Sequence, residues 1–181
     1  MRLLRRHLNP GQLGAMLYER LRAGLASESE LSMDELVRTL GKNPADLDPQ
    51  YAGEVMVGLM FSAWLAIERS ASPWVSKRIF EGMKLEFQNH LVEQGASAAQ
   101  RKEWMAVLDN RFAAYRETLE GYTGFEPPWK LGRLFFWNII GVEEHIAMSV
   151  KIATLFMMKA RDECQEMLNE YGPVLTTDRP M

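Results

Sequence analysis

Apolar residues recur three or four positions apart along most of the chain, which is the spacing of one face of an α-helix. Serine, asparagine or aspartate next to proline precedes several of these stretches, and glycine follows several of them, as is typical of helix starts and stops. No stretch alternates apolar and polar residues between hairpin turns, so no strand is predicted. The pattern predicts about seven helices, over residues 10–27, 33–41, 49–70, 73–95, 98–121, 131–140 and 142–171.

Local signals mark several of the expected helix ends. Ser32 with Glu35 and Ser97 with Gln100 have the spacing of a capping box, in which the two residues satisfy each other's free backbone N–H groups. Gly121 is expected to end the helix over 98–121, because glycine readily adopts the left-handed conformation that closes a helix. These signals divide the chain into helices joined by short connections, as in a helical bundle.

Two of the predicted helices, over 49–70 and 142–171, are apolar on most of their circumference. Such helices belong in the core of a bundle, so both are expected to be largely buried. In the first, the polar exceptions fall on one narrow stripe formed by Glu54, Gly58, Ser62, Glu68 and Arg69. In the last, apolar and small residues form one seam, made of Ile146, Val150, Ala153, Met157, Ala160 and Cys164.

The length and composition indicate one globular domain. The chain has 181 residues, of which 47% are hydrophobic and 25% are charged, and a chain of this size can build a full core without disulfides. No repeat, low-complexity tract or long linker divides it. We therefore expect one compact all-α domain over residues 1–181, with a basic N-terminal segment (1–8) and a C-terminal tail (172–181) at its periphery.

Charge and cysteine content narrow the classes of function. The formal net charge of -3 gives no overall attraction to phosphate backbones, which argues against nucleic-acid binding. Cys164 is the lone cysteine, so an intrachain disulfide scaffold is excluded. No secretory signal is recognised, and the uncharged runs are too short to cross a bilayer. We therefore expect a cytoplasmic protein without a transmembrane segment.

A cluster of carboxylates and imidazole is one candidate for chemistry. Glu86 and His90 are four residues apart on one face of the helix over 73–95. With Glu143 on the seam of the last helix and Glu54 or Glu68 on the polar stripe, they would provide ligands for iron or manganese. The Glu-x-x-His pairs of ferritin-like di-iron sites are missing, so a metal-dependent oxidase or oxygenase is only the alternative hypothesis. The preferred hypothesis, a non-catalytic binding protein, requires no cofactor.

The loop that precedes the helix over 131–140 has the most unusual composition in the chain. It combines aromatic residues with glycines and prolines, and such a loop can present rigid anchors to a partner. Tyr122, Phe125 and Trp129 are the candidate partner-binding residues. The other interpretation is an ordered connection whose aromatic rings pack back into the core, and the exposure of these rings distinguishes the two.

The first hypothesis is a non-catalytic helical binding protein, because the chain has no nucleophile motif and no phosphate-binding loop. Its partner is expected to be another protein or a second copy of the chain in a homodimer, since two very apolar helices are hard to enclose in a small bundle. A third hypothesis is a small-molecule sensor, in which Trp64, Phe87, Trp137 and methionines surround an apolar ligand in a sizeable closed cavity.

Overall fold

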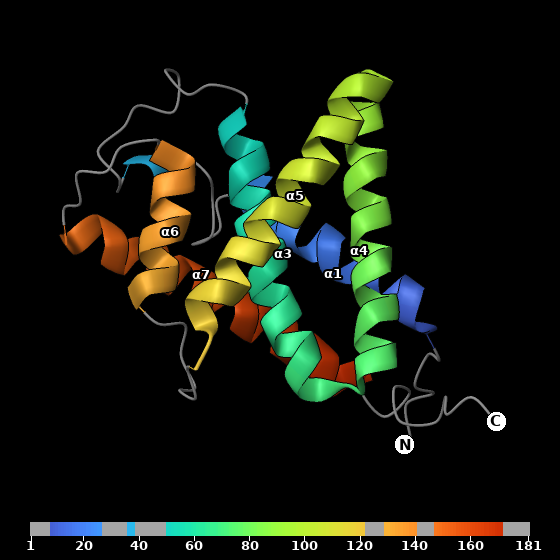
Figure 1. Cartoon of the computed structure of the whole chain (residues 1–181). Coiled ribbons are helices and arrows are strands. Elements are labelled where there is room, and N and C mark those ends of the chain that lie inside the picture. The colour runs from blue at the N-terminus through green and yellow to red at the C-terminus, as the bar shows by residue number, and fades with distance from the viewer. Residues whose placement is uncertain (1–7, 27–35, 39–49, 122–128, 141–146, 172–181) are drawn as a thin grey trace.

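The computed structural model describes residues 8–26, 36–38, 50–121, 129–140 and 147–171, and 92% of these residues are helical. No strand occurs among them, so the prediction of an all-α bundle is confirmed. Most of the helix predicted over 33–41 lies outside the described residues. Of this range only residues 36–38 are described, and they are helical. The other helices (Figure 1) are α1 (Pro10–Ala26), α3 (Gln50–Ser70), α4 (Pro73–Glu93), α5 (Ala98–Leu119), α6 (Trp129–Ile140) and α7 (Ala147–Tyr171).

The predicted signals at the ends of α5 are confirmed. The Gln100 backbone N–H donates to the Ser97 hydroxyl at 3.3 Å, and the Ser97 N–H donates to Gln100 Oε1 at 2.8 Å. Asn9 and Gln12 form the same reciprocal pair at the start of α1. Gly121, just beyond α5, has a φ of 75°, which is the left-handed conformation that only glycine adopts at little cost.

Helix α3 lies at the centre of the bundle and contacts each of the other five helices. Figure 1 shows α1 and α4 packed together on one side of α3 and α6 on the other, while α7 runs from α6 behind α3 and α5 crosses in front. Residues 55–64 of α3 form an unbroken buried stretch, so the expected burial of this helix is confirmed. The two sides of the bundle therefore share α3 as their common core.

Small residues of the predicted polar stripe of α3 lie in the core. Ser62 is fully buried, and its hydroxyl donates to the carbonyl oxygen of Gly58 at 3.0 Å, so it needs no partner outside its own helix. A Cβ atom at Gly58 would overlap the ring of Phe135 from α6. This part of the stripe therefore provides room for α6 rather than a polar surface.

The seam of α7 is buried as predicted at each of its described positions, which are Val150, Ala153, Met157, Ala160 and Cys164. Ile146 lies outside the described residues. Burial raises the pKa of Cys164 to about 12, so its thiol stays protonated at neutral pH. Cys164 is therefore a core residue rather than a nucleophile.

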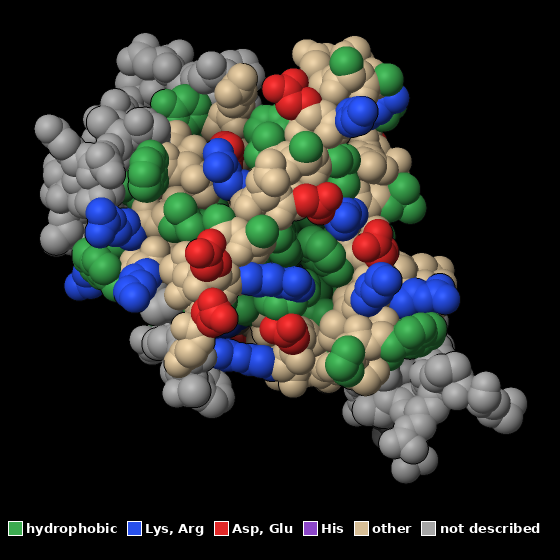
Figure 2. Space-filling model, viewed as in Figure 1, with side chains coloured by type: hydrophobic (Ala, Val, Ile, Leu, Met, Phe, Trp, Pro, Cys, Tyr) green, Lys and Arg blue, Asp and Glu red, His purple; other side chains and the backbone are tan. Residues whose placement is uncertain are grey.

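Aromatic side chains hold α5 across α3 and α4. The ring centroid of Phe112 on α5 lies 5.0 Å from that of Phe61 on α3 and 4.6 Å from that of Phe80 on α4. Figure 2 shows apolar side chains gathered in the hollow between α4 and α5, with charged side chains around them. The Arg116 guanidinium lies 4.2 Å from the ring centroid of Trp64 and shields it from water.

Among the described helices, α3 alone is long and apolar enough to cross a bilayer when judged by length and composition. In the bundle, 67% of its most apolar stretch is buried against other helices. The central helix of a bundle needs the same length and the same apolar composition. Its burial in the core therefore accounts for the apolar sequence of α3.

The backbones of α1 and α4 approach each other closely through glycines. A Cβ atom at Gly14 of α1 would overlap the carbonyl oxygen of Ile79, and one at Gly82 of α4 would overlap the carbonyl oxygen of Gly11. Neither obstacle is a side chain that can turn aside. A larger residue at position 14 or 82 therefore has to push the two helices apart.

We predict that Gly82→Ala lowers the free energy of unfolding by about 1–3 kcal/mol, the range for an overpacked core site. Urea denaturation of the purified protein measures this change. The matched control is Gly11→Ala in α1, whose added Cβ makes only an ordinary contact, at 3.4 Å from Asn9 Oδ1. The control is expected to keep the stability of the wild type, and an equal loss in both variants would contradict the close-packing explanation.

Candidate functional site

Glu54, one of the predicted metal ligands, is paired with an arginine. Arg111 of α5 donates to both of its carboxylate oxygens, at 2.7 Å from Nη2 to Oε1 and 3.0 Å from Nε to Oε2. The hydrogen bond to Glu54 also raises the pKa of Arg111, so the guanidinium remains charged. This bidentate pair uses the carboxylate oxygens that a metal ion would need.

The other described candidates for the metal site do not converge with Glu54. Glu68 lies at the opposite end of α3 from Glu54, roughly 20 Å away at a rise of ~1.5 Å per residue. Glu86 accepts a hydrogen bond from Asn89 Nδ2 at 3.2 Å. Within the described ranges, no three histidine, cysteine, aspartate or glutamate side chains come together in a way that could hold a metal ion. Glu143 lies outside those ranges.

The candidate partner loop is described only at its last residue. Tyr122 and Phe125 lie outside the described residues. Trp129 begins α6, and 48% of its surface is exposed. The Trp129 ring is thus not packed into the core, and a role for this loop in partner binding stays a prediction.

The aromatic residues of the small-molecule hypothesis do not share one cavity. Trp64 packs in the core against Phe61, with ring centroids 5.6 Å apart. Trp137 is 43% exposed on α6. Phe87 does line a pocket, together with the methionine Met56, but Trp64 and Trp137 are not part of that lining.

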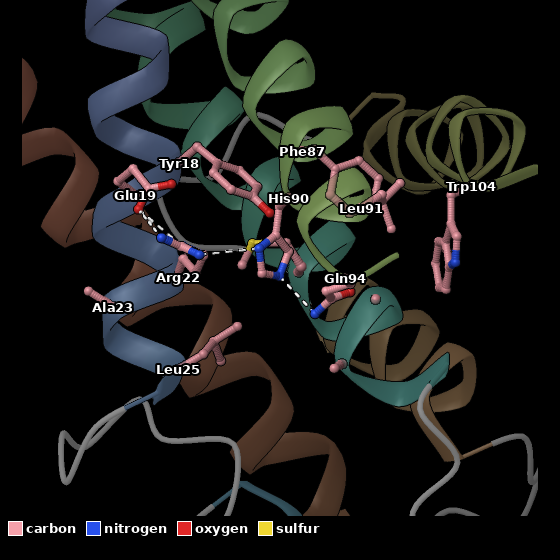
Figure 3. Close-up of a pocket in the computed structure, with 13 residues that line it drawn as sticks. Tyr18, Glu19, Arg22, Ala23, Leu25, Phe87, His90, Leu91, Gln94 and Trp104 are labelled. Atoms are coloured by element: carbon pink, nitrogen blue, oxygen red, sulfur yellow. Dashed lines mark hydrogen bonds and ion pairs between the residues drawn. The ribbon is translucent and has the colours of Figure 1, made fainter. Parts of the chain in front are cut away.

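A partly open pocket of about 760 Å³ lies between α1, α3, α4 and α5 (Figure 3). The C-terminal half of α1 and the end of α4 carry its polar side chains, and the first turns of α3 and α5 complete the wall. Most of the lining is apolar, which is typical of pockets for small molecules. The larger apolar side chains in the lining are Leu25, Met56, Phe87, Leu91 and Trp104.

His90 is held at the polar side of the pocket by two neighbours, as Figure 3 shows. Arg22 Nη1 lies 3.2 Å from His90 Nδ1. Because a guanidinium can only donate, Nδ1 accepts and the neutral ring carries its proton on Nε2. Gln94 Nε2 lies 3.0 Å from His90 Nε2, and with the amide turned to present its oxygen instead, the His90 Nε2–H donates a hydrogen bond to that oxygen.

The charged residues of the pocket are already paired with each other. Arg22 donates to Glu19 Oε2 at 2.8 Å from Nη2 and 3.0 Å from Nε, and the hydrogen bond to Glu19 raises the pKa of Arg22. A second carboxylate, that of Glu93, lies 3.5 Å from Arg22 Nη1. The positive charge of Arg22 is therefore offset before any ligand enters.

The hydroxyl of Tyr18 has no hydrogen-bond partner. Tyr18 is fully buried, and its Oη is the one buried side-chain polar atom without a partner in the part of the chain that is described. Burial raises the pKa of Tyr18 well above its ordinary value, so the group remains an O–H donor at neutral pH. In Figure 3 this hydroxyl points toward His90, at the polar side of the pocket.

Trp104 forms the far end of the pocket from Tyr18 (Figure 3). Its ring meets that of Phe87 edge to face, with centroids 6.2 Å apart and planes at 87°. The ring also lies against Gly53 of α3, where an added Cβ would overlap it. The absence of a side chain at Gly53 therefore sets the position of the indole in the pocket wall.

Comparison with known protein families, with curated proteins and with solved structures finds no match for this chain. Functional assignment therefore depends on the chemistry of the pocket. That chemistry consists of an apolar body, one ion pair formed by Arg22 and Glu19, one imidazole, one amide and one unpaired hydroxyl donor.

Sequence reasoning included Phe87 and His90 as candidates but missed Tyr18 and Arg22, which face them from α1. One signal was available: Tyr18 follows Leu17, which is buried with Leu13 and Leu21 along one stripe of α1, and Arg22 lies four residues after Tyr18 on the same side. A tyrosine beside a buried helix face, followed four residues later by an arginine, indicates the boundary between the core and a polar site. Nothing local indicates that α4 would be the facing helix.

We predict that Tyr18→Phe raises the free energy of unfolding of the ligand-free protein by about 1 kcal/mol, because an unpaired buried hydroxyl costs ~1–3 kcal/mol. The ring and its packing against Phe87 are kept in this variant. Urea denaturation measures the change.

The matched control is Tyr115→Phe. Tyr115 is also fully buried, but its hydroxyl accepts a hydrogen bond from Asn138 Nδ2 at 3.0 Å. Removing it is expected to lower the free energy of unfolding by about 1 kcal/mol. Destabilisation by both substitutions would show that the Tyr18 hydroxyl does have a partner.

Proposed function

We propose that this chain is a helical binding protein whose ligand is a small, largely apolar molecule held between α1, α3, α4 and α5. The observation that carries this proposal is the pocket of about 760 Å³ with its mostly apolar lining. Pockets for small ligands measure about 300–1,000 Å³ and combine apolar walls with few polar groups. This pocket matches that description in size and in the placement of Arg22, His90 and Tyr18 at one side.

The rigidity of the surrounding helices supports binding at this position. The pocket walls belong to four helices, so most of the lining is held by regular backbone. A preformed site loses little conformational entropy when a ligand enters. The pocket therefore suits reversible binding without a large rearrangement of the bundle.

We predict that the wild type binds N-phenyl-1-naphthylamine, a neutral apolar dye whose fluorescence rises in apolar surroundings. Ala52→Phe is expected to weaken this binding about tenfold or more, a change of ~1.4 kcal/mol per tenfold, because the new ring enters the pocket. Ala52 is exposed at the pocket wall, so the substitution leaves the core intact. Fluorescence titration gives the Kd of each variant.

The matched control for this titration is Ala113→Phe. Ala113 is an exposed alanine on α5 that does not line the pocket. This control is expected to bind the dye like the wild type. If the dye does not bind the wild type, or if it binds Ala52→Phe as tightly as the wild type, the proposal of a ligand site in this pocket is refuted.

Self-association is a second proposal, favoured by an exposed and mostly apolar stripe on α4. Trp74, Leu85 and Val92 are 41%, 56% and 54% exposed. At ~100° per residue these three positions fall within about 20° of one line along the helix, and the exposed Glu81 is the charged residue on that line. A second copy presents the same stripe, so two α4 helices placed side by side would cover both stripes at once.

We predict that sedimentation velocity finds a dimer for the wild type and a monomer for Leu85→Glu, because a second carboxylate in the stripe, one turn from Glu81, is costly to bury. Leu85 is exposed in the monomer, so the variant should fold normally. The control is Leu155→Glu on α7, which changes a leucine of similar exposure, 50%, away from α4 and should leave the dimer intact. A monomeric wild type at high concentration would refute the proposal.

A further inference from the structure

We infer that the pocket selects a neutral apolar molecule that carries one hydrogen-bond-accepting oxygen, and that the Tyr18 hydroxyl donates to that oxygen. The inference rests on the proposed function, since it names the class of ligand for the same pocket. It depends on three features of the described residues. These are the ion pair of Arg22 with Glu19, the unpaired hydroxyl of Tyr18, and the apolar wall that extends from Tyr18 to Trp104.

The charges at the pocket disfavour an anionic ligand. Arg22 is the one cation of the lining, and both Glu19, at 2.8 Å, and Glu93, at 3.5 Å, already lie against it. A carboxylate ligand would have to displace Glu19 from Arg22 and remain next to two carboxylates. An anion that enters an apolar pocket without a partner of its own loses its hydration and gains little in return.

The same arrangement disfavours a cationic ligand. The carboxylate of Glu19 is held by two hydrogen bonds from Arg22, so an ammonium group would have to compete with a guanidinium that is already in place. It would also lie close to the positive charge of Arg22. The lining of the pocket carries one cation and one carboxylate, Arg22 and Glu19, which are paired with each other, so a neutral molecule enters without separating an ion pair.

The Tyr18 hydroxyl supplies the specific polar contact. It is a donor without an acceptor in the ligand-free protein, and the Tyr18 residue lies in the pocket wall. A ligand oxygen that accepts this hydrogen bond satisfies a group that water does not reach. A site with an unpaired buried donor discriminates strongly against analogues that lack the acceptor, because the donor then stays unsatisfied.

His90 covers the hydroxyl in the ligand-free structure. The rings of Tyr18 and His90 lie with centroids 6.3 Å apart, and the Tyr18 hydroxyl points to the His90 side of the pocket (Figure 3). The imidazole is held by Arg22, which is partly exposed, and by Gln94, which is exposed, so we expect this ring to turn when a ligand oxygen enters. The apolar part of the ligand then extends toward Trp104 at the other end.

The test measures how well three probes displace bound N-phenyl-1-naphthylamine from the protein. The probes are decan-2-one, decanoate and decylammonium, which have alkyl chains of about the same length. Decan-2-one, which is neutral and can only accept, is expected to displace the dye at the lowest concentration. In Tyr18→Phe the affinity for decan-2-one should fall by roughly fivefold or more relative to the affinity for the dye, which offers only an N–H donor.

Tyr115→Phe is the matched control, because it removes the hydroxyl of another fully buried tyrosine that does not line the pocket. It should bind decan-2-one like the wild type. Stronger displacement by decanoate or by decylammonium, or an unchanged ratio of ketone to dye affinity in Tyr18→Phe, overturns this inference while dye binding still supports the pocket. Failure of the wild type to bind the dye instead overturns the proposed function itself.

Discussion

The close contact between α1 and α4 is the constraint on which the pocket depends. Glycines at positions 14 and 82 leave no side chain where the two backbones meet, so the helices approach more closely than larger residues allow. Further along α1, this approach brings Tyr18 against α4 and Arg22 within 3.2 Å of His90. With the helices further apart, the guanidinium would not reach the imidazole, and the buried hydroxyl would be open to water.

The helix ends and the buried faces were predictable because the information for them is local. The capping pair of Ser97 and Gln100 spans one helical turn, and Gly121 acts through its own backbone conformation. The seam of α7 was predictable for the same reason, since burial repeats every three or four residues along a single helix. These features need no knowledge of which helix packs against which.

The pocket was not predictable, because it depends on contacts between residues far apart in the sequence. Periodicity identifies the face of a helix that is buried but not the helix that covers it. The metal hypothesis placed His90 with carboxylates, whereas its hydrogen-bond partners are Arg22 from α1 and Gln94, which directly follows α4. Glu54 was assigned to the same site, and its partner Arg111 comes from α5, a helix that the metal hypothesis did not include.

The central position of α3 also determines how the two sides of the bundle are coupled in unfolding. The pocket belongs to α1, α3, α4 and α5, whereas α6 lies on the opposite side of α3 from α4 and packs against α7. A bound ligand stabilises only conformations that keep the pocket intact, so it suppresses openings that separate α1 from α4. Local openings that release α6 from α7 leave the pocket in place and are not suppressed. Amide hydrogen exchange in the bound protein should therefore slow on one side of α3 more than on the other, with α3 as the boundary between two cooperative units.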